Sequence, residues 1–134
     1  IEAFYPETTW NPSSDRIAIF GDHEHWNGRT EYASLGGCYY SARLAVAEKL
    51  EEKRRQAGAI VLREAHPGYI LPVGVWNVRE SVRNALKSNP RKLETKSQVF
   101  AYLDEKMDLD YKEWISVSEL LDERKVQQRM ENFF

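Results

Sequence analysis

The order of four neighbouring segments most constrains the fold of this chain: a short apolar run, a polar loop, a long amphipathic segment and a second apolar run. The first run spans residues 16–20 and ends at Gly21, and the second spans 59–62 and is rich in β-branched residues. Between them, over residues 39–56, apolar side chains recur at three- and four-residue steps while charged ones occupy the other face. The apolar set is Tyr40, Leu44, Ala47 and Leu50. The order predicts two buried parallel strands joined by a right-handed helical crossover.

The rest of the chain predicts further elements around this unit. Helical spacing of apolar residues predicts helices over 75–86 and after Ser97, and a last short helix over 118–123. Turn-forming residues in 1–15 predict an N-terminal arm outside the sheet, and 69–73, with a proline, predict an edge strand. The sequence thus predicts an α+β domain over residues 1–123, a small mixed sheet covered by amphipathic helices, with a flexible peptide tail over 124–134.

Composition excludes several classes of protein. No stretch of about eighteen apolar residues occurs, so no membrane span is predicted. The net charge of −2 argues against binding nucleic acid through a uniformly basic surface. With Cys38 as the single cysteine, no intrachain disulfide can form, and a reducing cytoplasm is expected. Because the chain begins with isoleucine and not with methionine, we expect it to be cut from a longer protein, with functional parts upstream.

The last eight residues carry one glutamine, one aliphatic residue and two aromatics at offsets zero, three, six and seven: Gln127, Met130, Phe133 and Phe134. One turn of 3₁₀ helix would stack Met130 over Phe133 and give an apolar plug that fits a partner's pocket. The spacing resembles the PCNA-interacting peptide, or PIP motif, which docks repair proteins on the DNA sliding clamp. The alternative is that these side chains form the apolar stripe of a helix folded onto the core.

The loop after the first predicted strand concentrates potential metal ligands. His23 and His25 would point to one side of an extended loop, and Cys38 or His66 would complete a zinc set of three or four ligands. The alternative is a hydrogen-bonded surface loop, because no CxxC or HExxH spacing supports a zinc site.

Three carboxylates, Asp22, Glu24 and Glu64, follow or end two strands that are expected to be neighbours. Converging carboxylates hold the metal of a magnesium-dependent nuclease, so a nuclease acting on DNA is an alternative function. The lysine that usually accompanies such a set is missing near Glu64, and salt-bridged structural roles compete with this hypothesis.

Four basic residues are candidates for contacts with DNA phosphates. Arg79 and Arg83 lie four apart on one predicted helix, and Arg91 and Lys92 follow in the next loop. Glu80 lies between the two arginines, so an ion-paired, solvated helix face is the alternative.

Residues 35–46, 60–64 and 72–86 resemble the C-terminal region of the archaeal Nre family of DNA repair proteins, most specifically in Val-Trp-x-Val-Arg-Glu-x-Val-Arg at 75–83. The resemblance implies a cytoplasmic archaeal protein acting in DNA damage repair and tethered to the sliding clamp PCNA by Gln127, Met130, Phe133 and Phe134. Family members are longer and carry a zinc-finger-like segment near the N-terminus, so the resemblance places zinc there and implies no cofactor in this chain. It implies no established catalytic activity.

Overall fold

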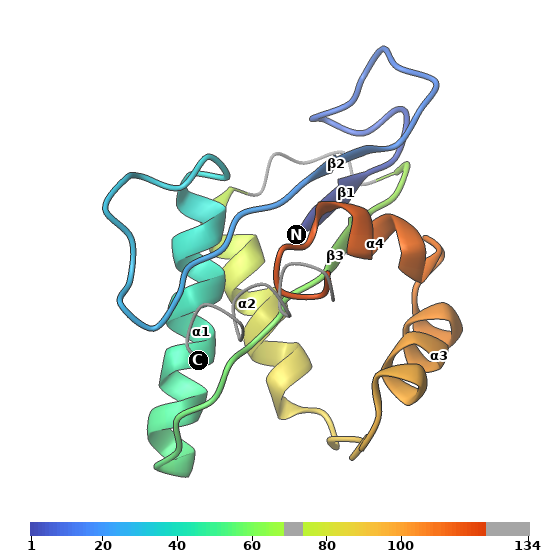
Figure 1. The fold of residues 1–134 in the computed structure, drawn as a ribbon. Coiled ribbons are helices and arrows are strands. Elements are labelled where there is room, and N and C mark those ends of the chain that lie inside the picture. Colours follow the sequence, from blue (N-terminus) through green and yellow to red (C-terminus); the bar gives the residue numbers. More distant parts are fainter. Residues whose placement is uncertain (69–73, 123–134) are drawn as a thin grey trace.

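The computed structural model describes residues 1–68 and 74–122 (Figure 1). These residues form three strands and four helices. In chain order they are β1 (Glu2–Phe4), β2 (Ala18–Phe20), α1 (Gly37–Lys53), β3 (Arg63–Ala65), α2 (Val75–Lys87), α3 (Lys96–Lys106) and α4 (Tyr111–Val117). The predicted α+β class, with a small mixed sheet and covering helices, is confirmed.

The sheet has the order β2-β1-β3, with β1 in the centre. Ala3 of β1 pairs with Ile19 of β2 in the antiparallel direction and with Glu64 of β3 in the parallel direction. Two sequence predictions were therefore wrong. The N-terminal residues form the fully buried central strand rather than an arm, and β2 and β3 are neither neighbours nor parallel.

The apolar run at 59–62 is not a strand, because its side chains serve two different clusters. Val61 packs against the interface of α1 and α2, whereas Leu62 packs against the sheet. Ile60 remains 44% exposed. Strand β3 begins only at Arg63, where the chain reaches Glu2 of β1 and the two side chains form an ion pair at 3.0 Å.

One part of the core lies between the sheet and the C-terminal helices. The indole ring of Trp114, on α4, is completely buried and packs with Ala3 and Leu109. The partly buried side chains of Ile17, Ile19 and Met107 surround it. Burial of this ring attaches α4 to the sheet.

The second part of the core is the interface of α1 and α2, which lie side by side in Figure 1. Ala45 of α1 packs against Val78 and Val82 of α2. A β-carbon on Gly37 would lie 2.7 Å from Val75 Cγ2, so glycine at this position lets the two helices approach at their N-termini. The buried face of α1 differs from the apolar face that the spacing predicted. Leu44, on the predicted face, is 44% exposed, and the small residues Ala42 and Ala45 face α2 instead.

Local signals set the helix ends. Helix α1 ends at Arg54, whose φ of 51° is left-handed, before the predicted end at 56. Thr95 and Gln98 form a capping box at the start of α3. The predicted helix over 118–123 was wrong in position, because Asp110 caps α4 earlier and Ser118 already ends it.

Two further observations complete the fold. The predicted edge strand over 69–73 lies outside the described residues. Within residues 1–68 and 74–122, no helix has both the length and the apolar character that a bilayer crossing demands.

Candidate functional site

A cavity of about 1030 Å³ lies between the loop after β2, helix α1, the segment 56–61 and the turn after α4. It brings together parts of the chain that are far apart in sequence. Several residues that line it can bind a metal ion or transfer a proton, among them His23, Glu24, His25, Cys38 and Glu119.

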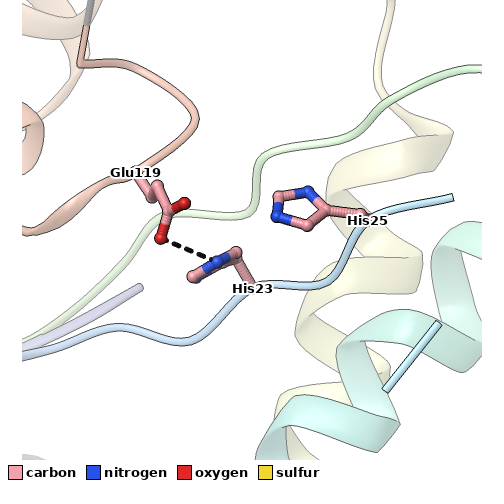
Figure 2. A group of neighbouring side chains, drawn as sticks. All are labelled: His23, His25 and Glu119. Atoms are coloured by element: carbon pink, nitrogen blue, oxygen red, sulfur yellow. Dashed lines mark ion pairs between the residues drawn. The ribbon is translucent and has the colours of Figure 1, made fainter. Parts of the chain in front are cut away.

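Two histidines and one glutamate form a compact cluster in this lining (Figure 2). His23 and His25 come from the loop after β2, and Glu119 comes from the turn after α4. The His23 Nε2 and Glu119 Oε2 atoms are 2.8 Å apart. The two imidazole rings are tilted by 55°, with centroids 5.2 Å apart. One ligand atom of each residue lies within 4.8 Å of the other two, which is within reach of a single metal ion.

The structure thus places the two predicted histidines together, but it supplies a partner that sequence reasoning did not find. Glu119 lies ninety-four residues after His25, and no spacing pattern links it to the loop. Cys38 lines the same cavity but is not a member of the cluster. Burial, followed by the negative charge of Glu2, raises the pKa of the Cys38 thiol and so opposes the thiolate form that binds zinc.

Asp22 organises the loop that carries both histidines. Its carboxylate accepts hydrogen bonds from the backbone and hydroxyl of Ser34, at 2.6 and 3.0 Å, and from the His23 backbone N–H at 2.9 Å. It also forms an ion pair with Arg29, which donates to the His23 carbonyl at 2.6 Å. Burial raises the pKa of Asp22, but these hydrogen bonds outweigh it and leave that pKa below its ordinary value.

The other two carboxylates of the nuclease hypothesis lie in separate environments. Glu24 is paired with Arg43 at 3.3 Å. Glu64 accepts hydrogen bonds from the backbone N–H groups of Leu109, at 2.7 Å, and Asp108, at 3.2 Å. Among the residues that the structure describes, Asp22, Glu24 and Glu64 do not gather within reach of one metal ion.

Glu64 belongs instead to a second group with His66 and Asp108. His66 Nε2 lies 3.3 Å from Glu64 Oε2 and 3.7 Å from Asp108 Oδ2. The imidazole stacks on Tyr5 with a centroid distance of 4.3 Å. Because Glu64 already accepts two backbone hydrogen bonds, this group joins β3 to the start of α4.

The four basic candidates for DNA contact differ in how strongly their charge is balanced. Arg83 forms ion pairs with Glu48 and with Glu80, both at 2.7 Å. Arg91 pairs with Glu105 at 3.3 Å, and Lys92 lies 4.0 Å from Glu94 on a largely exposed side chain. The Arg79 guanidinium covers the Trp76 ring at 4.7 Å from its centroid. Arg83 is therefore the most completely neutralised of the four.

The terminal set Gln127, Met130, Phe133 and Phe134 lies outside the described residues, so its role stays a prediction from the sequence.

Comparison with known proteins identifies relatives over most of the chain. The chain is 46% identical over 120 residues to DNA repair protein NreB of Archaeoglobus fulgidus, which covers 90% of this chain and 30% of the relative. It is 44% identical over 95 residues to DNA repair protein NreA of the same organism, covering 71% of this chain and 24% of the relative. It is 40% identical over 97 residues to DNA repair protein NreA of Haloferax volcanii, covering 71% of this chain and 23% of the relative.

The chain therefore spans less than a third of the length of these relatives. No solved structure matches it. The sequence model of the family described as "Archaeal Nre, C-terminal" matches residues 24–133. This match covers most of the chain and confirms the predicted resemblance: the chain belongs to the archaeal Nre family, in its C-terminal region.

Proposed function

We propose that this chain acts in DNA repair and docks on the DNA sliding clamp PCNA through a C-terminal PIP motif. The observation that carries the repair role is the 46% identity, over 90% of the chain, to a protein named a DNA repair protein. The clamp contacts fall on Gln127, Met130, Phe133 and Phe134, whose spacing matches the motif at each defining position. We place this activity in the cytoplasm, in keeping with the single cysteine and the archaeal relatives.

The proposed mechanism is tethering. A short peptide that binds the clamp raises the local concentration of the folded part at DNA that the clamp already encircles. The folded part then needs little affinity for DNA of its own. The paired state of Arg83 and Arg91, together with the net charge of −2, is consistent with such weak affinity.

Within this mechanism Arg79, Arg91 and Lys92 provide the contacts with DNA phosphates, and Arg83 contributes least. The ion pairs of Arg91 and Lys92 are exposed, so a phosphate can replace a carboxylate there at small cost. By contrast, a phosphate approaching Arg83 would have to displace two carboxylates.

A metal-dependent nuclease acting through Asp22, Glu24 and Glu64 has less support. Each of these carboxylates already has cationic or backbone partners, and Glu64 lies on β3 whereas Asp22 and Glu24 lie in the loop after β2. Incubation with Mg²⁺ or Mn²⁺ and duplex, nicked or branched DNA tests this alternative, and we expect no cleavage.

Calorimetric titration into an archaeal sliding clamp tests the clamp docking. We expect the intact chain to bind and a chain truncated after Glu123 not to bind. Replacing Glu131 and Asn132, which lie between the motif positions, with alanine provides the matched control and should leave binding nearly unchanged. Equal binding by the intact and truncated chains, or none by either, would overturn the proposed docking.

A further inference from the structure

We propose that His23, His25 and Glu119 form a binding site for a divalent transition-metal ion, with zinc as the best fit. The donor set is two imidazoles and one carboxylate, a combination that catalytic zinc sites use. Neither the family match nor the clamp docking requires such a site, so this inference is independent of the proposed function.

The distances within the cluster suit a metal ion. Zinc holds nitrogen and oxygen ligands at about 2.0–2.2 Å, so two ligand atoms of a tetrahedral site lie about 3.3 Å apart. The separation between His23 Nε2 and Glu119 Oε2 is 2.8 Å, and all three ligand atoms lie within 4.8 Å of one another. Side-chain rotations that change the distances between the ligand atoms by a fraction of an ångström to about 1.5 Å would bring the three atoms to this spacing.

The backbone of the histidine loop is held on both sides of His23. The His23 N–H donates to Asp22, and the His23 carbonyl accepts from Arg29. The Asp22 carboxylate also binds Ser34, which joins the two ends of the loop. A loop fixed in this way presents His23 with little loss of conformational entropy when a metal binds.

Glu119 is positioned by the turn that follows α4. The Ser118 hydroxyl accepts a hydrogen bond from the Leu121 N–H at 3.2 Å, and the Ser118 carbonyl accepts one from the Asp122 N–H at 3.1 Å. Ser118 itself is buried. The carboxylate therefore projects from an ordered turn toward the loop, as Figure 2 shows.

The site has room for a further ligand. Three protein ligands leave one position of a tetrahedral ion open, and all three residues line the cavity of about 1030 Å³. The open position would hold water or an oxyanion that enters through the cavity. The cavity lining also includes Tyr39, which carries a hydroxyl, and Arg43, whose guanidinium is paired with Glu24.

The group of Glu64, His66 and Asp108 meets the same distance criterion and serves as the comparison. There, the Glu64 carboxylate accepts two backbone N–H groups that hold the fold together, and the side chain of the third member, Asp108, is 79% exposed. We therefore assign the metal to the His23 cluster alone, and His66→Ala is the matched control.

The test is titration of the chelator-treated chain with Zn²⁺ by calorimetry, with Co²⁺ as a spectroscopic probe. We expect one ion per chain and visible Co²⁺ bands typical of low coordination number. His23→Ala, His25→Ala and Glu119→Gln should each weaken zinc binding by more than about tenfold, whereas His66→Ala should leave it unchanged.

Circular dichroism of each variant separates loss of a ligand from loss of the fold, and Glu119→Gln keeps the shape of the side chain if an alanine variant unfolds. No stoichiometric binding by the unsubstituted chain would overturn the assignment, as would an equal loss in His66→Ala. Clamp binding by the His23→Ala variant should be unaffected, so the two proposals fail separately.

Discussion

The carboxylate of Glu64, in strand β3, accepts a hydrogen bond from the backbone N–H of Leu109, forty-five residues later in the chain, at 2.7 Å. The same carboxylate accepts the N–H of Asp108. The pair joins the sheet to the segment that leads into α4, and Leu109 is itself part of the core beneath Trp114.

We therefore expect Glu64→Ala to destabilise the fold by about 1.5–3 kcal/mol, because it removes a charged acceptor from a buried backbone donor. Chemical denaturation measures this loss. Asp108→Ala, which keeps the Asp108 backbone N–H and the Glu64 acceptor, is the control and should cost much less. A Glu64→Ala variant as stable as the unsubstituted chain would contradict this structural role.

Replacement of Trp114 tests the core between the sheet and α4. Trp114→Ala should cost about 3–5 kcal/mol, since it leaves a cavity where a fully buried ring packs against Ala3. Trp114→Phe should cost less, because the indole N–H has no hydrogen-bond partner among the described residues. Thermal unfolding followed by circular dichroism measures the stability of both variants. Equal losses of stability would contradict the proposed role of ring burial.

Acidification should release the histidine loop. The folded-state pKa of Asp22 is lowered, so its contribution to stability is fully present above the ordinary pKa of the group in the unfolded chain and is lost as the pH falls through the folded-state value. Unfolding midpoints measured from about pH 6 down to pH 3 should therefore fall less steeply below pH 4 for Asp22→Asn than for the unsubstituted chain. Parallel profiles would mean that Asp22 titrates alike in both states.

DNA affinity should depend on the basic residues in the order of their exposure. Arg91→Gln with Lys92→Gln should weaken binding to duplex DNA and reduce the slope of log K against log salt by up to about two. Arg83→Gln should leave the slope unchanged and weaken binding less, because its guanidinium is already held by two carboxylates. Fluorescence anisotropy over a salt series measures these slopes, and a larger effect from Arg83→Gln would reverse the assignment.

Clamp affinity should depend on the two terminal phenylalanines. Phe133→Ala with Phe134→Ala should weaken clamp binding by at least about a hundredfold, since aromatic side chains in a partner's pocket commonly contribute 2 kcal/mol or more each. The thermal unfolding midpoint should change little. A large fall in that midpoint would instead assign the phenylalanines to the core.

The sequence predicted the helices better than the sheet, and the reason is physical. Amphipathic spacing is a local signal, and it located α1, α2 and α3 to within a few residues. A three-residue strand such as Glu2–Phe4 has no such signal, because its identity depends on partners sixteen and sixty-one residues away, at 18–20 and 63–65. The run at 59–62 looked like a strand because it is apolar, but that character comes from packing against two clusters.

The candidate site was likewise predicted only where its residues are close together in the chain. His23 and His25 are close in the chain, so their pairing was visible in the sequence, whereas Glu119 enters the cluster only through the fold that attaches α4 to the sheet. The nuclease hypothesis depended on β2 and β3 being parallel neighbours, and the central position of β1 removed that premise.

The central position of β1 also bears on how the protein folds during its synthesis. Residues 2–4 are made before their parallel partner at 63–65, which follows only after α1, and Trp114, which covers the sheet, comes forty-nine residues after that partner. Until then β1 has an unpaired edge and an uncovered apolar face. We therefore expect nascent chains that end before α4 to remain open to proteases and chaperones, and native structure to form only after most of the chain has left the ribosome.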